Sequence, residues 1–121
     1  MDSRHKLRLK IVQELFSYSF KNKKDSKNDF TDKTNHVIDN LSIINDLIKK
    51  FAPKFPIDKI SRVDLAIMQL GVYEMTIEDK EPIKVIINEA VELAKELGSD
   101  RSYSFINAVL GKINTERLKK C

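Results

Sequence analysis

Apolar residues recur along most of this chain at intervals of three and four positions, the spacing that places them on one face of an α-helix. Between residues 6 and 20 two such rows lie side by side and predict a helix with a wide buried face. Four more segments keep the same period: residues 37–51, 63–77, 82–97 and 105–113. Long alternating runs of β-branched and aromatic residues, which are typical of strands, are not found in the sequence. The pattern therefore predicts an all-α fold.

Several residues are suited to start or stop these helices. Thr34 or Asn35 is expected to cap the second helix, and the prolines that follow residue 51 are expected to end it. Residues 61–64 have the form of a capping box, in which Asp64 stands where glutamate or glutamine is usual. Pro82 is suited to the first position of the helix that follows it.

Two glycines and one polar run indicate where the chain packs closely or turns. Gly71 lies inside a predicted helix, where glycine costs about 1 kcal/mol relative to alanine, and so indicates a close helix crossing. Gly98 is expected to take the left-handed conformation that ends a helix, with Ser99 or Asp100 capping the next one. Residues 21–35 are almost wholly polar and predict a loop.

The totals are those of one ordinary domain, and we expect a single domain over residues 1–121. Hydrophobic residues make up 41% and charged residues 33% of the chain. No apolar run approaches the roughly 20 residues that span a bilayer, and no signal peptide follows Met1. The only cysteine is Cys121, so a disulfide framework is excluded. The expectation is a cytoplasmic protein without membrane contact.

Charge is distributed unevenly along the chain. Residues 1–24 hold seven lysines and arginines against two acids, and residues 101–121 hold five against one. Residues 58–100 carry ten acids against five bases. If the two basic ends meet in space, they form a positive face that attracts nucleic acid, with an acidic face elsewhere. A merely solubilising surface explains the same charges, so both interpretations stay open.

The sequence offers no constellation typical of an enzyme. Glu89, Glu92 and Glu96 have helical spacing, but a carboxylate metal site in a helical bundle also needs Glu-x-x-His motifs, and neither His5 nor His36 belongs to one. A serine in a nucleophile elbow and a glycine-rich phosphate loop are also missing from the sequence. We therefore expect no metal, no cofactor and no catalytic residue.

The basic N-terminal segment is the strongest candidate for nucleic-acid binding. Arg4, Lys6, Arg8 and Lys10 alternate around the start of the first helix, where they can bridge successive phosphates of a single strand. Stacking of unpaired bases needs flat side chains as well, and the candidates are Phe16, Tyr18, Tyr103 and Phe105. The helical spacing of Phe16 and Phe105 fits the core equally well, so stacking and core roles both remain open.

Four segments resemble the NusB family of bacterial antitermination factors. They are RLKIVQELF at residues 8–16, VDLAIMQLGVYE at 63–74, PIKVIINEAVELAK at 82–95 and GSDRSYSFINAVLGK at 98–112. The last 60 residues match almost continuously, whereas the N-terminal half matches in its first helix and in general spacing. The N-terminal segment departs from the family pattern, because it mixes lysine and histidine where the family is arginine-rich.

The resemblance implies two small packed helical bundles and a role in antitermination of ribosomal RNA operons. The expected partners are single-stranded boxA-type RNA, the ribosomal protein NusE and the transcription elongation complex. Carried over position by position, RNA contact falls on Arg4, His5, Lys6, Arg8, Gln13, Phe16, Arg101, Ser104 and Phe105, and NusE contact on Asp64 and Glu74.

Two alternatives keep the same fold. One is the NusB-like N-terminal domain of a ribosomal RNA cytosine methyltransferase, which requires a following domain with a glycine-rich cofactor site, whereas this chain ends at Cys121. The other is a homodimeric interaction module that does not bind RNA. The sequence does not decide between a monomer and a homodimer.

Overall fold

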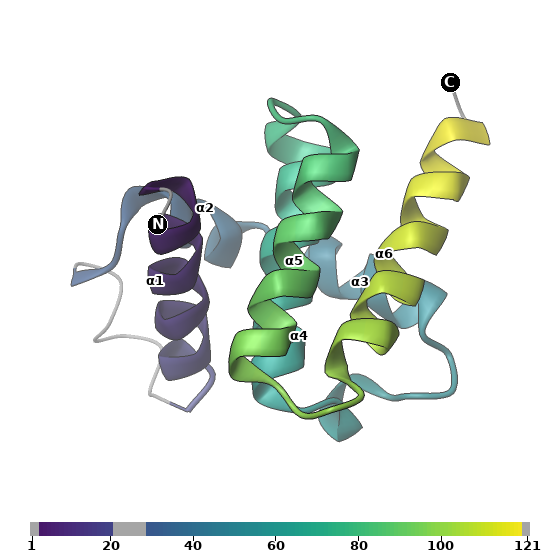
Figure 1. The fold of residues 1–121 in the computed structure, drawn as a ribbon, viewed down its shortest axis with the longest axis horizontal. Coiled ribbons are helices and arrows are strands. Elements are labelled where there is room, and N and C mark those ends of the chain that lie inside the picture. Colours follow the sequence, from purple (N-terminus) through teal and green to yellow (C-terminus); the bar gives the residue numbers. More distant parts are fainter. Residues whose placement is uncertain (1–2, 21–28, 120–121) are drawn as a thin grey trace.

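The computed structural model describes residues 3–20 and 29–119, and that part of the chain forms helices and no strand. Six α-helices follow one another (Figure 1): α1 (Ser3–Tyr18), α2 (Asp32–Asp39), α3 (Leu41–Phe51), α4 (Arg62–Tyr73), α5 (Ile83–Leu97) and α6 (Ser102–Lys119). A 3₁₀ turn, η2 (Ile57–Lys59), precedes α4, and a π-helical turn, η3 (Glu74–Glu78), follows it. The predicted all-α fold is confirmed. Most of the predicted polar loop, residues 21–28, lies outside the described residues, as does Cys121.

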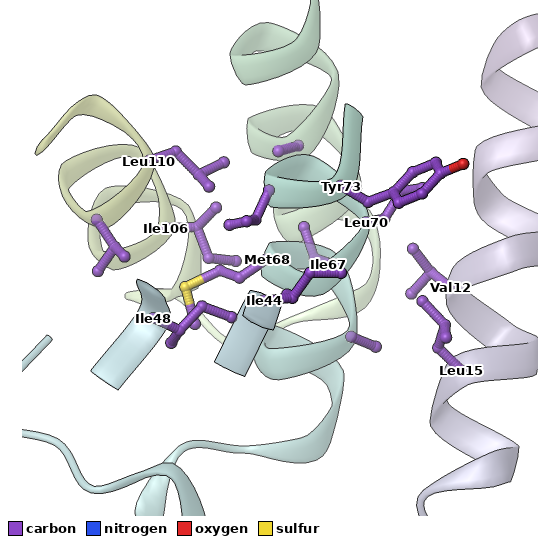
Figure 2. Packing of buried hydrophobic residues seen from close by; sticks show 14 of the residues in the cluster. Val12, Leu15, Ile44, Ile48, Ile67, Met68, Leu70, Tyr73, Ile106 and Leu110 are labelled. Carbon is purple, nitrogen blue, oxygen red and sulfur yellow. The ribbon is translucent and has the colours of Figure 1, made fainter. Parts of the chain in front are cut away.

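Helix α4 is the centre of the fold. It packs against α1 and α2 on one side and against α3, α5 and α6 on the other (Figure 1). Every residue from Ala66 to Tyr73 is buried, because each side of this helix meets a neighbour. Met68 packs toward α3 and α6, while Val12 of α1 points toward α4 (Figure 2). The two groups of helices share α4, and one continuous cluster of apolar side chains runs through both.

The predicted second helix is two helices. It is interrupted at Asn40, whose side-chain amide donates to the carbonyl of His36 at 2.7 Å and so competes with the helical hydrogen bonds there. The predicted cap was also wrong, since α2 begins at Asp32 and Thr34 lies buried inside it. Glu14 of α1 accepts from the Thr31 amide (3.1 Å) and the Thr34 hydroxyl (2.6 Å). A tertiary contact therefore takes the place of the predicted local cap.

At the start of α4 half of the predicted capping box is confirmed. The Ser61 hydroxyl accepts from the Asp64 amide at 3.1 Å. The Asp64 carboxylate does not complete the box: its Oδ1 atom is buried without a hydrogen-bond partner among the described residues.

The two glycines behave differently. Gly71 lies where α4 crosses α6, and a Cβ atom there would be 3.1 Å from Leu110 Cδ1, so the predicted close crossing is confirmed. Gly98 is extended, with φ −97° and ψ −168°, and the predicted left-handed conformation is wrong. Crowding requires glycine at this position instead, because a Cβ atom would lie 2.5 Å from Ser102 Oγ and 2.8 Å from the Ala94 carbonyl oxygen.

A Gly98→Ala substitution is therefore expected to lower the free energy of unfolding by about 1–3 kcal/mol, the range for forcing extra carbon into a filled site. Gly111→Ala is the matched control, because a Cβ at this α6 position meets nothing within 4 Å. Helix propensity should make the control more stable by up to about 1 kcal/mol. Urea unfolding of both variants measures the difference, and equal midpoints would show that the corner at Gly98 relaxes freely.

Candidate nucleic-acid interface

The outward face of α1 presents basic and polar side chains. Lys6, Lys10 and Gln13 are exposed, and their spacing of four and three residues places them in one row on the helix. Arg4 precedes Lys6 by two positions and therefore lies on another side of α1. Its side chain is 67% exposed, and one guanidinium nitrogen lies 3.5 Å from Glu81. The row continues toward Phe16, which is half-buried. This α1 row (Lys6, Lys10 and Gln13) spans about 10 Å of helix and offers two cations to a ligand.

An aromatic cluster lies at the end of this row. Phe16 and Phe20 meet edge to face, with ring centroids 4.9 Å apart, and Phe20 is 60% exposed. The Arg62 guanidinium lies over the Phe20 ring at 4.1 Å and donates to the Ser19 carbonyl, which joins α1 to the start of α4. Sequence reasoning missed Phe20 and Arg62, because 42 residues of chain separate them and only the packing of α1 on α4 brings them together.

His5 turns away from this surface. Its Nδ1 atom lies 3.1 Å from Glu89 Oε2 and its Nε2 atom 2.9 Å from Glu96 Oε1, both on α5. The hydrogen bond to Glu96, and next that to Glu89, raises the pKa of His5 above its ordinary value of 6.5. Both ring nitrogens face carboxylates, an arrangement that the protonated ring satisfies by donating twice. His5 therefore fastens the basic segment to α5 instead of presenting its ring to a ligand.

Stability is expected to depend on pH through His5. Its folded-state pKa is raised, so this contribution is fully present below pH 6.5 and is lost as the pH rises through the folded-state value. Glu89 and Glu96 are the acids that face the ring, and Arg8 is the nearby base that shares Glu89. Urea midpoints of the native chain and of His5→Gln should converge as the pH rises through this window. Parallel curves would contradict the assigned role.

Arg8 is buried beneath the α1 row, with 5% of its surface exposed. Its Nε atom lies 3.1 Å from both carboxylate oxygens of Glu74, and its Nη1 atom lies 3.4 Å from Glu89. Lys33 of α2 reaches the same Glu74 at 2.7 Å and Glu78 at 3.1 Å. This ion-pair network (Arg8, Lys33, Glu74, Glu78 and Glu89) joins α1, α2, η3 and α5.

The network corrects two expectations. Arg8 was expected to contact RNA and Glu74 to contact NusE, but Glu74 is only 1% exposed and both charges are satisfied inside the protein. RNA contact by Arg8 was implied by the resemblance, whereas its spacing with Ile11, Val12 and Leu15 places it on the buried face of α1. Glu74 likewise follows the buried residues Ile67 and Leu70 by seven and four positions, so it continues the buried face of α4 and pairs there with Arg8 and Lys33.

A hollow of about 460 Å³ lies where α4 and α6 begin. Arg101 and Ser104 are exposed on its α6 side, and Asp64 lines its α4 side. Phe105 is half-buried there and meets Phe55 edge to face, with centroids 5.1 Å apart. Phe105 thus packs on the core and lines the hollow at the same time, so neither of its two predicted roles excludes the other.

The two basic ends of the chain do not meet. Helix α1 and the C-terminal part of α6 stand at opposite sides of the molecule, with α4 and α5 between them (Figure 1). The condition for one positive face formed by both ends is therefore not met. Arg62 links the α1 row to the hollow. Its guanidinium lies over the Phe20 ring, and its neighbour in sequence, Ser61, lines the hollow.

Within the described ranges, no group of three or more histidine, cysteine, aspartate or glutamate side chains is arranged to hold a metal ion. Glu89 and Glu96 bind His5, and Glu92 pairs with Lys95 at 3.6 Å on the exposed side of α5. Among the helices described, none is both long and apolar enough to cross a membrane.

Comparison with known proteins identifies the family of this chain. The sequence profile of the NusB family matches residues 2–115. The chain belongs to the NusB family. The transcription antitermination protein NusB of Thermotoga maritima is 31% identical over an alignment that covers 97% of this chain and 94% of that protein. NusB of Agathobacter rectalis is 40% identical, covering 82% and 76% of the two chains. NusB of Chloroflexus aggregans is 44% identical, but the match spans 64% of this chain and about half, 53%, of that relative.

Solved structures of the NusB family share the fold. The crystal structure of Thermotoga maritima NusB superposes with a TM-score of 0.81 at 30% identity, covering 95% of this chain and 92% of that one. A structure of the antitermination factors NusB and NusE in complex with double-stranded RNA gives a TM-score of 0.75 at 18% identity, covering 95% and 99%. The second likeness concerns the fold alone. The NusB-like fold expected from the sequence is confirmed.

Proposed function

We propose that this chain is a transcription antitermination factor that binds boxA-type RNA together with NusE and supports processive transcription of ribosomal RNA operons. The observation that carries the proposal is the family match over residues 2–115, which includes both the α1 row and the hollow at the start of α6. The chain acts as a binding adaptor within the transcription elongation complex and not as an enzyme. It works in the cytoplasm as a single domain of residues 1–121.

The RNA-binding part of the proposal begins on α1. Lys6 and Lys10 attract the phosphates of a single strand, and Gln13 provides an amide at the same face. Arg4 adds a cation at the start of the helix. Phe16 lies at the end of the row, beside the exposed Phe20 ring on which an unpaired base can stack. Arg8 and His5 support this surface from beneath, by fixing α1 against α5.

The strand then passes the Arg62 side chain and reaches the start of α6. Arg101 and Ser104 are exposed there and offer a cation and a hydroxyl. Phe105 presents the part of its ring that faces the hollow. Both ends of this path combine cations with aromatic rings, the combination that single-stranded nucleic acid requires.

The NusE-binding part of the proposal rests on Asp64. Its Oδ1 atom is buried, lacks a partner among the described residues and belongs to a side chain that lines the hollow. A basic side chain of the partner protein that enters the hollow can form a charge-assisted hydrogen bond with the Asp64 carboxylate. Glu74 has no such role in the proposal, because its charge is already satisfied within the ion-pair network.

The test is a titration of boxA-type RNA and a scrambled control, with and without NusE, at two salt concentrations. Tighter binding of boxA RNA, strengthened by NusE, is the expected result. Equal and weak binding of both RNAs, with only salt sensitivity in common, would overturn the proposal. Sedimentation of the free chain at the same concentrations separates loss of RNA binding from burial of the surface in a homodimer.

A further inference from the structure

The hollow at the start of α6 continues along that helix. A second hollow shares Phe55 and Phe105 with it and is also lined by Phe51 and Lys112. A third hollow shares Phe51 and Lys112 with the second and extends past Gly111. The three hollows follow one another along α6. Their other side is formed by α3 and the segment after it, and α3 and α6 lie side by side in Figure 1. We call this series the α3–α6 furrow.

Cationic side chains predominate along the α3–α6 furrow. Lys54 and Lys112 line its second hollow, and Lys59 and Arg101 line the first; all four are exposed. The carboxylates that line these hollows belong to Asp64 and Glu116. From Arg101 to Lys112 the furrow follows about 16 Å of helix. The furrow is therefore a positive strip on a side of the molecule that the α1 row does not reach.

Aromatic rings alternate with these cations. Phe105 and Phe55 form an edge-to-face pair in the first two hollows, and Phe55 is 50% exposed. Phe51 lines the second and third hollows, and Lys50 Nζ lies 5.3 Å from the centre of its ring. Contact of exposed apolar surface with water is unfavourable, so a patch of such rings indicates a surface that a ligand covers.

We propose that the α3–α6 furrow is a second track for single-stranded RNA, which binds nucleotides adjoining the boxA-type element. The proposal rests on the RNA-binding function proposed above and extends the bound strand beyond the hollow at the start of α6. Lys54 and Lys112 neutralise phosphates, and Phe55 and Phe51 stack with bases. Because every base has a flat face, this track tolerates different sequences, in contrast to recognition of the boxA-type element itself.

Two features favour RNA over an acidic protein as the occupant. The furrow is continuous with the candidate RNA surface, since Arg101 and Phe105 belong to both. The cations also alternate with planar rings, whereas an acidic helix would need the cations and an aliphatic stripe.

The experiment compares a boxA-type RNA with the same RNA carrying about ten uridines at its 5′ or its 3′ end. One extended RNA should bind about tenfold more tightly than the unextended RNA. The slope of log affinity against log salt should steepen by about 0.7 for each added phosphate contact. The variant Lys54→Glu/Lys112→Glu should abolish this gain and leave the affinity for the unextended RNA unchanged.

The matched control is Lys49→Glu/Lys84→Glu, which changes net charge equally at two exposed lysines that do not line the furrow. It should retain the gain. Equal affinity for the three RNAs in the native chain, or a gain that survives Lys54→Glu/Lys112→Glu, would overturn the proposal. Oligouridine titrated alone distinguishes the two failures: binding that requires Lys54 and Lys112 supports the furrow even if boxA recognition fails.

Discussion

A Glu74→Gln variant is expected to lose about 3 kcal/mol of unfolding free energy, one of the largest effects of any single change at a polar residue. The carboxylate is 1% exposed and is shared by Arg8 at 3.1 Å and Lys33 at 2.7 Å. Glutamine has nearly the same shape but no charge, so Arg8 remains buried with only the longer contact to Glu89, at 3.4 Å. An uncompensated buried cation is what makes the change costly.

Urea unfolding monitored by circular dichroism measures this loss. The double variant Arg8→Met/Glu74→Gln removes both charges and should recover most of it, because no buried ion is left unpaired. Glu92→Gln is the surface control: it breaks an exposed pair with Lys95 and should change the unfolding free energy by less than about 0.5 kcal/mol. If Glu74→Gln were as mild as this control, the network would not contribute to holding α1 in place.

The second large effect is expected in RNA binding. Replacing Lys6 and Lys10 with glutamate should weaken binding of boxA-type RNA about 10- to 100-fold at low salt, because two phosphate contacts become repulsions. The slope of log affinity against log salt should become shallower by about 1.4. Both side chains are exposed on α1, so stability should change by no more than about 0.5 kcal/mol.

Fluorescence anisotropy at several salt concentrations measures both quantities. Arg8 is unsuitable for this test despite its basic charge, since its replacement would mix binding with the folding cost described above. Lys80→Glu/Lys84→Glu provides the same change of net charge at exposed positions outside the α1 row. An equal loss of affinity in this control would mean that net charge alone, and not the α1 row, attracts the RNA.

Some features of the site follow from helical spacing, whereas others depend on residues that are distant in the sequence. The α1 face that carries Lys6 and Gln13 follows from helical spacing, and the structure leaves both residues exposed as that spacing predicts. The same spacing places Arg8 on the buried face, since it precedes Ile11, Val12 and Leu15 by three, four and seven positions. Its partner does not follow from spacing, because Glu74 lies 66 residues away in the sequence. Periodicity marks which residues share a face, but it does not say which face a distant carboxylate will approach.

Local sequence also misled where a tertiary contact replaced a local one. Thr34 has the character of a cap but lies inside α2, since Glu14 of another helix binds it and the Thr31 amide. Gly98 was expected for its freedom at positive φ, and crowding by Ser102 accounts for it instead. In both cases the residue type indicated a special position, but a different neighbour explains it. For Thr34 the neighbour is Glu14 of another helix, and for Gly98 it is Ser102 of the following turn.

The sequence by itself determined the helical class, most helix positions and the family, because apolar periodicity and the motifs at residues 63–112 are properties of short segments. Only the tertiary structure decided which charges pair with one another. It paired Arg8 with Glu74, turned His5 to α5, separated the two basic ends and joined Phe55 to Phe105. The reason is that a side chain's electrostatic partner is set by packing between helices, over distances in sequence that no local pattern records.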